Sequence, residues 1–338
     1  MIATPDNFIA IPLMTLRENQ GRLPDLYLRY PDQEKPILYR SASYQMQELD
    51  WEELEDLGWS YLWLHESEAA KFSQRFEERI DSIIHDSQIE LSEKCEMVFS
   101  VAYQWMQQVF ESSNPRYVLQ SSEPLISGFL EVIFSDPRAA HLFITKASVN
   151  FELYSHSINV LLYGVSLAKN ALEISQEEAL TQYGPGFLMH DIGKLRIPET
   201  LWDIEDSDED SDDQKTIRHH IDYGIEIIRE FIELPPASEA IIRHHHERMD
   251  GSGYPDGLVG EQIPIEARIA AIADLFDTLS TNRSQRERMT SFEALKLMRS
   301  MVPGKFDENL FERFVFLFHP PVHPSTGYAD NSAEANLE

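Results

Sequence analysis

The chain has 338 residues and a formal net charge of −30, with 42% hydrophobic and 25% charged residues. This hydrophobic and charged content is that of an ordinary globular protein, and the length favours two domains. The negative charge argues against duplex nucleic acid and anionic membranes as partners, because both would repel the protein.

The cellular location is predicted from features that the sequence lacks. Residues 1–7 contain no basic segment followed by an apolar run, so we expect no signal peptide. No window approaches the roughly 18 apolar residues of a membrane span. Cys95 is the single cysteine, which excludes an intramolecular disulfide and fits a reducing compartment. These features together predict a cytoplasmic protein without a membrane span.

The first 90 residues combine strand patterns with helical ones. A helical pattern is present over 43–57, and an exposed helix is expected over 66–84. Residues 1–90 are therefore predicted to form a small α+β regulatory or interaction module. Short aromatic-rich runs separated by Gly, Pro and Asp predict its strands over 8–11, 26–30, 36–40 and 59–64.

From about residue 91 onward, apolar residues recur at helical spacing almost without a break. The pattern predicts an all-α part, with linking helices over 91–147 and a helical domain over 148–318. The tail over 319–338 is rich in Pro, Ser and Asn and is expected to be disordered. The predicted helices cover 92–112, 121–134, 136–148, 150–174, 176–183, 185–193, 215–232, 236–246, 264–281, 291–301 and 307–318.

An acidic run interrupts the helical part. Eight of the eleven residues from 203 to 213 are Asp or Glu. Such a block repels itself and cannot be buried, so it predicts a mobile loop. A solvated insertion is the simpler interpretation, and a dedicated metal or partner site is the alternative.

Histidines are concentrated in the second half of the chain, where seven of the twelve lie from position 156 to 246. Carboxylates accompany them, and imidazole with carboxylate suits Fe, Mn, Zn or Ni rather than Ca or Mg. A single histidine or His-Asp pair has an ordinary structural explanation, but the clustering of all of them has none. At least seven candidate ligands on five helices predict a metal centre.

The spacing of the candidate residues from 152 to 194 is consistent with a single metal centre. Glu152 and His156 lie four residues apart on one predicted helix and project from the same face. His190 and Asp191 form an adjacent pair at a helix end, where the carboxylate would bridge two metals. Lys194 follows closely and would meet a phosphate as a point charge.

The later candidates add three more positions. His245 and His246 are adjacent, so both reach one cluster only if their helix ends there. His220 opens a further helical segment, and Asp274 lies on a later helix with Asp277 one turn away.

Five motifs follow one another between positions 156 and 277 of the chain. They are His156, His190-Asp191-Ile192-Gly193-Lys194, His220-x-x-x-Gly224, His245-His246-Glu247-Arg248-Met249-Asp250-Gly251-Ser252-Gly253-Tyr254-Pro255 and Ala273-Asp274-Leu275-Phe276-Asp277. In this order they resemble the HD-GYP subgroup of HD-domain phosphohydrolases, over roughly residues 145–318. Members of that family hydrolyse the bacterial second messenger cyclic-di-GMP to pGpG and on to GMP. The resemblance implies an all-α HD-type helical bundle that holds two or three metal ions, often iron.

The resemblance also implies a ligand set. Glu152 matches a position that serves a third metal in some members, so a trinuclear site is conceivable. His219 and His244 fall outside the motif register, and Asp274 fits it better than Asp277. One metal ion, with iron expected and manganese or another transition metal as alternatives, would be held by His156, His190, Asp191 and Asp274. The second would be held by His220, His245 and His246, with Asp191 bridging.

The reaction implied by the resemblance is attack on phosphorus by a hydroxide that bridges the two metals. Asp191 and Lys194 would be the catalytic residues, and Lys194 would help to neutralise the phosphoryl oxygens. The loop 250–257 would form a wall of the site and shape its entrance. The predicted substrate contacts are Lys194, Arg283, Arg286, Arg248, Asp250 and Tyr254.

Two departures from the family pattern leave other functions open. Ser284-Gln285 stands where the family usually has Pro-Tyr, and the acidic run replaces a segment that usually contains Lys-Pro-Gly. Carboxylates near the entrance would oppose an anionic dinucleotide, although salt screens them beyond about 8–10 Å. The main prediction is a metal-dependent cyclic-di-GMP phosphodiesterase. The alternatives are a weakly active or inactive adaptor that binds, for instance, diguanylate cyclase (GGDEF) domains, and a phosphohydrolase of another phosphoester.

Overall fold

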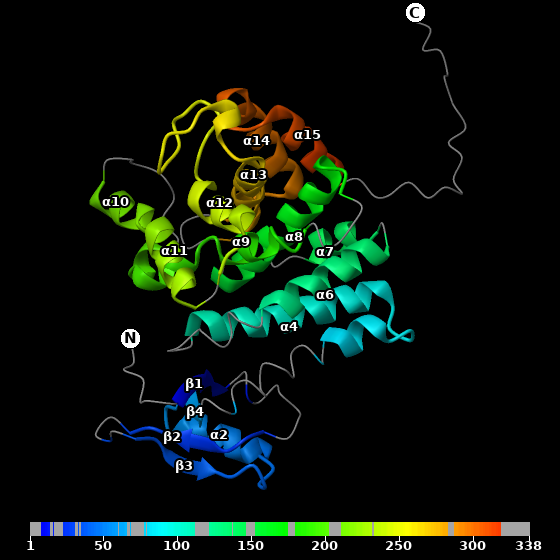
Figure 1. Cartoon of the computed structure of the whole chain (residues 1–338). Coiled ribbons are helices and arrows are strands. Elements are labelled where there is room, and N and C mark those ends of the chain that lie inside the picture. The colour runs from blue at the N-terminus through cyan, green and yellow to red at the C-terminus, as the bar shows by residue number, and fades with distance from the viewer. Residues whose placement is uncertain are drawn as a thin grey trace, which may run out of the picture.

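A computed structural model describes residues 8–318, except for 14–15, 17–22, 31–32, 34, 60, 66–67, 69–77, 79, 112–121, 137, 147–152, 175–179, 203–210, 232 and 283–286. A small antiparallel sheet is followed by a mainly helical body (Figure 1). The expected fold class, a small α+β part before an all-α bundle, is confirmed. No helix among the described residues is long and apolar enough to cross a membrane.

The sheet is formed by the runs predicted as strands. Its four strands are β1 (Phe8–Pro12), β2 (Leu26–Leu28), β3 (Ile37–Arg40) and β4 (Tyr61–His65), in the order β1-β4-β2-β3. In β2, Leu26 and Leu28 are buried while Tyr27 between them is half-buried, because successive side chains point to opposite faces. Helix α2 (Glu48–Asp56) adds the buried side chains of Trp51 and Leu54 to the core.

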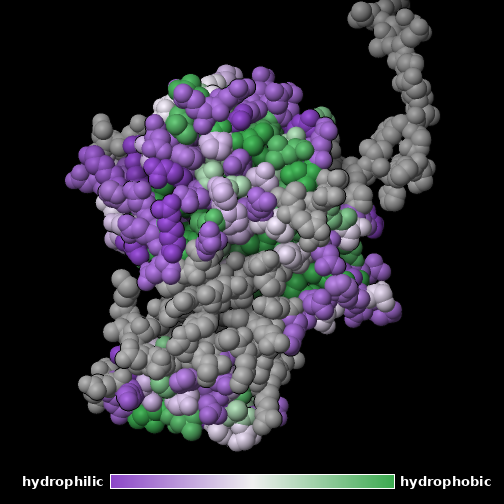
Figure 2. All heavy atoms as spheres, viewed as in Figure 1, coloured by the Kyte–Doolittle hydropathy of each residue, from purple (hydrophilic) through white to green (hydrophobic). Residues whose placement is uncertain are grey.

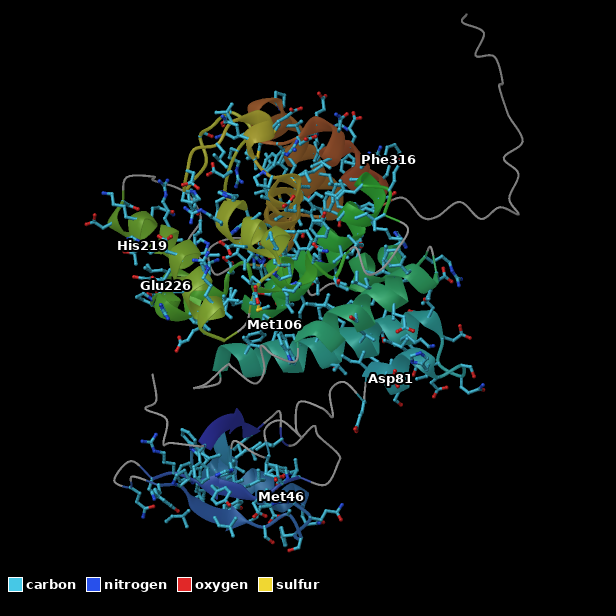
Figure 3. All side chains as sticks on the ribbon, in the orientation of Figure 1. Met46, Asp81, Met106, His219, Glu226 and Phe316 are labelled. Atoms are coloured by element: carbon cyan, nitrogen blue, oxygen red, sulfur yellow. The ribbon has the colours of Figure 1, made fainter. Side chains whose placement is uncertain are left out.

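The helical body is organised around α8 (Leu153–Ala171). Every residue from Ser155 to Ala168 is buried, as expected of a helix that other helices surround. Its neighbours are α4 (Leu91–Glu111), α7 (Ala139–Lys146), α9 (Gly184–Met189), α13 (Ile265–Ser280) and α15 (Glu308–Phe316), and α6 (Ser122–Ser135) lies beside α4 and α7. Figure 3 shows Met106 of α4 in the layer between α4 and this body.

The remaining helices complete the side of the body that carries the histidines. They are α10 (Asp212–Arg218), α11 (His220–Phe231), α12 (Pro236–His244), α14 (Ser291–Lys305) and the short 3-10 helices η2 (Ile192–Arg196), η3 (Glu199–Leu201) and η4 (Gly260–Gln262). α11 packs against η2, and α12 packs against α9 and α13. Hydrophilic side chains cover the outer face of α10 and α11 (Figure 2), and those that are exposed include Asp212, Lys215, Asp222, Glu226 and Arg229.

Most predicted helices are present, with ends shifted by a few residues. The single helix expected over 215–232 is wrong, because the chain breaks at His219 and forms α10 and α11. The helix expected over 185–193 ends at Met189, and a 3-10 turn follows. Residues 180–183 form a turn, and the rest of the helix expected over 176–183 lies outside the described residues. Most of 66–84, residues 203–210 of the acidic run and the tail 319–338 also lie outside them.

Candidate metal centre

The structure brings the predicted ligands together inside the helical body. They come from α8, from the chain after α9, from the start of α11, from the end of α12 and from α13. Two groups have possible ligand atoms within 4.8 Å of one another: Asp191 with His220, His245 and His246, and Asp191 with His156 and His190. Asp274 completes the set, since its Oδ1 lies 3.4 Å from His156 Nε2.

Asp191 stands between the two groups. Its Oδ1 lies 3.4 Å from His220 Nε2 and 4.0 Å from His245 Nε2. Its Oδ2 lies 3.4 Å from His156 Nε2 and 3.6 Å from His190 Nε2. Oδ1 is buried and has no hydrogen-bond partner among the described residues. A buried carboxylate whose oxygens face separate sets of imidazoles fits the bridging ligand of two metal ions.

Lys194 is the cation nearest to this carboxylate. Its Nζ donates to Asp191 Oδ2 at 2.6 Å, and its side chain is 13% exposed. Burial raises the pKa of the Asp191 carboxyl, but the Lys194 ammonium and the surrounding imidazoles outweigh burial and hold that pKa well below its usual range. Asp191 is therefore an anion at neutral pH, which is the form that binds metal.

Helix ends determine where the side chains of adjacent histidines point. His245 and His246 converge, whereas His219 and His220 point apart. α12 ends at His244, so His245 and His246 follow the last helical turn and their ring centroids lie 4.2 Å apart. At the break between α10 and α11, His220 is fully buried whereas its neighbour His219 is exposed on the outer face (Figure 3). The expectation that the adjacent histidines need a helix end is confirmed at His245 and His246.

Four of the five predicted histidine ligands are oriented by a hydrogen bond at Nδ1. A nitrogen that donates to an oxygen leaves the opposite nitrogen, Nε2, with the lone pair that binds metal. The Nε2 atoms of His156 and His190 lie 3.1 Å apart, and those of His220 and His245 lie 3.4 Å apart. The Nδ1 partners are Asp277 Oδ2 for His156 at 2.7 Å, Phe187 O for His190 at 2.9 Å, Ile217 O for His220 at 2.6 Å and Ile242 O for His245 at 3.0 Å.

The role of Asp277 and Asn159 was not anticipated from the sequence. Asp277 is fully buried; its Oδ2 contacts His156 Nδ1, and its Oδ1 accepts from Asn159 Nδ2 at 2.6 Å. Asp277 thus orients a predicted ligand instead of facing the cluster. The signal in the sequence was a polar Asn159, three residues after His156, within the run 158–165, whose other residues are Ile, Val, Leu, Tyr and Gly.

Replacing Asp277 by asparagine is expected to weaken metal binding roughly 10- to 100-fold, the usual effect of losing the carboxylate behind a histidine ligand. Titration of chelator-treated protein with Mn²⁺ would measure the dissociation constant. Asp222→Asn, at an exposed position of α11, is the matched control and should leave the affinity unchanged. Equal affinities in the Asp277 variant and the wild type would contradict this role.

Buried imidazoles make the stability of the metal-free protein depend on pH. Burial lowers the pKa of His220 to about 4 and that of His245 to about 3. Burial also opposes the charged form of His156, but hydrogen bonds with Asp191, Asp274 and Asp277 outweigh it and raise the pKa of His156 to about 10. In an unfolded chain, the pKa of all three would be about 6.5.

We expect the free energy of unfolding of the metal-free protein to be largest near pH 6.5. Below that pH, His220 and His245 bind protons in the unfolded chain but stay neutral where they are buried in the folded protein. The free energy of unfolding therefore falls towards pH 4, by up to roughly 1.4 kcal/mol per pH unit for each group. Above it the folded state retains the His156 proton, so stability falls as pH rises towards 10. Urea unfolding from pH 4 to 9 would show this. His220→Gln should flatten the acid side and His219→Gln should not; equal curves for the two variants would refute the assignment.

Three of the predicted substrate contacts, Arg248, Asp250 and Tyr254, lie in the loop after His246. Arg248 is held by the carbonyl oxygens of His245 and Glu247, at 3.2 and 3.0 Å, and lies over the Phe306 ring. Asp250 accepts from Ser252 N at 2.9 Å and is exposed, so it shapes the loop. The predicted contacts Arg283 and Arg286, together with Glu152, lie outside the described residues.

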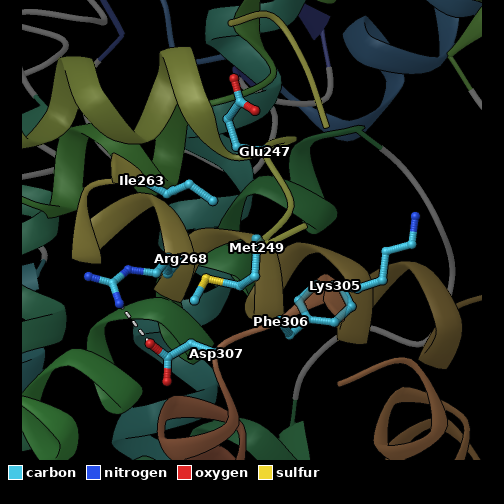
Figure 4. Close-up of a pocket in the computed structure, with 8 residues that line it drawn as sticks. Glu247, Met249, Ile263, Arg268, Lys305, Phe306 and Asp307 are labelled. Carbon is cyan, nitrogen blue, oxygen red and sulfur yellow. Dashed lines mark hydrogen bonds and ion pairs between the residues drawn. The ribbon is translucent and has the colours of Figure 1, made fainter. Parts of the chain in front are cut away.

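A pocket beneath this loop is separate from the cluster. Figure 4 shows it between the loop and α13, with the ion pair of Arg268 and Asp307 at 2.7 Å on one side. Lys305 Nζ donates to Ser252 Oγ at 2.8 Å and ties the end of α14 to the loop. None of the seven predicted ligands lines it; its lining residues are Glu247, Met249, Ile263, Arg268, Ala271, Lys305, Phe306 and Asp307.

Comparison with known proteins identifies related chains. Residues 165–310 match the HD domain family. The chain is 27% identical over 248 residues to 3'3'-cGAMP-specific phosphodiesterase 2 of Vibrio cholerae, covering 72% of this chain and 44% of the relative. It is 37% identical over 147 residues to the cyclic di-GMP phosphodiesterase response regulator RpfG of Xanthomonas campestris, covering 42% of this chain and 37% of the relative. It is 31% identical over 162 residues to cyclic di-GMP phosphodiesterase PA4108 of Pseudomonas aeruginosa, covering 48% and 38%.

A solved structure shares the fold of nearly the whole chain. Bd1817, titled an HDG"Y"P protein from Bdellovibrio bacteriovorus, has a TM-score of 0.63 and 19% identity, covering 91% of this chain and 98% of that one. The chain spans less than half the length of each of the three curated relatives named above. Residues 165–310 match the HD domain family, and the helical fold, the His and Asp cluster and these relatives support the resemblance of the chain to HD-GYP phosphodiesterases.

Proposed function

We propose that this protein is a metal-dependent phosphodiesterase that hydrolyses cyclic-di-GMP to pGpG and GMP at the cluster around Asp191. The observation that carries the proposal is the Asp191 carboxylate, whose two oxygens face two separate groups of imidazoles. Imidazole and carboxylate donors suit iron, the expected metal, and also manganese. The relatives named cyclic di-GMP phosphodiesterases support the choice of substrate.

Divalent metal ions, when bound, supply an acidified water as nucleophile and positive charge for the phosphoryl oxygens. His156, His190, Asp191 and Asp274 would hold one ion. His220, His245 and His246, with Asp191, would hold the other. The side chain of Lys194 is only 13% exposed, so solvent would weakly screen its ammonium as it neutralises charge on the phosphate. Arg283, Arg286 and a third-metal role for Glu152 belong to the proposal on sequence alone.

The proposal divides the chain by role. Residues 148–318 would form the phosphohydrolase domain, and residues 1–90 a regulatory or interaction module. Residues 91–147 would be the linking helices. Cys95, the single cysteine of the sequence, is buried and supports action in a reducing compartment, the cytoplasm.

A second candidate substrate is 3'3'-cGAMP, which differs from cyclic-di-GMP in one base and contains the same kind of phosphodiester. The relative that aligns with 72% of this chain is named as specific for it.

The test is incubation of protein loaded with Fe²⁺ or Mn²⁺ with each cyclic dinucleotide, followed by chromatography of the linear products. We expect pGpG and then GMP from cyclic-di-GMP. Faster turnover of 3'3'-cGAMP would reassign the substrate. Metal-loaded protein that cleaves neither would reject the enzymatic proposal in favour of the adaptor, which predicts GGDEF-domain binding that persists in a His190→Ala/Asp191→Ala variant.

A further inference from the structure

His246 differs from the other four predicted histidine ligands. Each of those four has a hydrogen bond from Nδ1 to a carboxylate or carbonyl oxygen. The Nδ1 of His246 is buried and has no hydrogen-bond partner among the described residues. Partners behind a ligand fix the orientation of its ring, and their loss weakens metal binding. The orientation of the His246 ring therefore depends on another contact.

The ring of Tyr254 makes that contact. It stacks on the His246 imidazole with ring centroids 4.6 Å apart and an angle of 19° between the planes. The other rings near His246 meet it at steeper angles, 85° for His220 and 44° for His245. A nearly parallel stack restricts rotation of the imidazole about its last side-chain bond, which is the motion that a hydrogen bond at Nδ1 would otherwise restrict.

The tyrosine ring is itself held in place by the loop before it. A Cβ on Gly253 would lie 2.4 Å from both Glu247 Cα and Arg248 N, so only glycine lets the loop lie directly on the backbone after His246. Tyr254 N donates to His246 O at 3.4 Å.

The chain after Tyr254 is fixed by Glu247, the residue next to His246. Its buried carboxylate accepts hydrogen bonds from three successive backbone N–H groups, those of Asp256 at 2.8 Å, Gly257 at 3.1 Å and Leu258 at 3.0 Å. The Arg218 guanidinium of α10 also lies over the tyrosine ring, with Cζ 4.7 Å from the centroid. Contacts of the residues before and after Tyr254 therefore hold its ring against His246.

We propose that Tyr254 is a positioning residue for the metal centre, and that the face of its ring fixes His246 where the other ligands use a hydrogen bond. The inference rests on the proposed function, because it takes His246 as a metal ligand. It gives the tyrosine of the Gly-Tyr-Pro sequence a role in orienting a metal ligand, in addition to the substrate contact expected from sequence.

The test compares variants that keep or remove the aromatic face. The full chain, freed of metal by a chelator, is titrated with Co²⁺, and the d–d absorption reports the affinity and geometry of each site. Tyr254→Phe should bind two ions as the wild type does. Tyr254→Leu should bind one ion normally and the second roughly 10- to 100-fold more weakly, with a changed spectrum. Tyr254→Met, with a flexible side chain of similar length, is the second non-aromatic variant if leucine does not fold.

Tyr223→Leu is the matched control, because the Tyr223 ring lies beside His219, a histidine outside the cluster, at 5.9 Å. It should change neither affinity nor spectrum. Unchanged affinities and spectrum in the folded non-aromatic variants would overturn the inference, as would equal losses in Tyr254→Phe and Tyr254→Leu. Neither of these two outcomes would contradict the proposed function, provided that the wild type binds two ions and cleaves a cyclic dinucleotide. A wild type that takes up no cobalt would overturn the metal centre and this inference together.

Discussion

Turnover of the cyclic dinucleotide is expected to fall at least about 1000-fold in an Asp191→Asn variant, equal to about 4 kcal/mol in activation free energy. Asparagine has nearly the same shape, but it cannot offer an anionic oxygen to each of the two imidazole groups that Asp191 faces. At least one of the two metal ions should be lost with the activity. Initial rates with saturating Mn²⁺, together with the metal content of the purified variant, would measure both effects.

Lys194→Gln separates metal binding from catalysis. The lysine contacts Asp191 Oδ2 but is not a predicted ligand, so this variant should retain both ions and lose turnover. Full activity in Asp191→Asn would refute the bridging role. Loss of both ions in Lys194→Gln would show instead that the lysine is needed to assemble the site.

Gly193→Ala is expected to destabilise the fold by about 3 kcal/mol or more and to displace His220. A Cβ at this position would lie 1.8 Å from His220 O and 2.5 Å from Gly224 N. Both atoms belong to the backbone of α11, which packs directly on η2, so no side-chain rotation relieves the overlap. Urea unfolding would give the loss in free energy, and metal content would show the loss of the second group of ligands.

The matched control is Gly224→Ala, on the other side of the same contact. Its Cβ would meet Gly193 N at 3.4 Å and Ile192 Cγ2 at 3.6 Å, which are ordinary contact distances. Because alanine favours a helix over glycine by up to about 1 kcal/mol, this variant should be as stable as the wild type or slightly more so. Similar destabilisation by the two substitutions would contradict the close approach of η2 to α11.

Local patterns were sufficient to predict the fold class and most elements. The strands near 8–12, 37–40 and 61–65 and the helices around α8 follow from period-two and helical spacing of apolar residues. Apolar spacing did not reveal the break at His219, because the spacing continues across that residue, although the motif that begins at His220 indicated a new helical segment there. The break results from tertiary packing, in which His220 must be buried beside Asp191 while the outer face of α10 stays in solvent.

The candidate site was predictable in its ligand types but not in its supporting contacts. Ordered motifs named all seven residues that the structure brings together. The choice of Asp274 over Asp277 fits the geometry, because Asp277 instead contacts His156 Nδ1. Neither that contact nor the stack of Tyr254 on His246 is encoded by spacing, since each joins elements whose approach depends on the whole fold.

The number of divalent metal ions bound per chain shows whether Asp191 joins two metal ions. Protein purified without chelator and saturated with Fe²⁺ or Mn²⁺ under reducing conditions should contain at least two ions per chain by elemental analysis. Asp191→Asn should contain fewer, and Asp222→Asn on the exposed face of α11 should equal the wild type. One ion or none in the wild type, or an unchanged count in Asp191→Asn, would contradict a centre in which one carboxylate joins two metals.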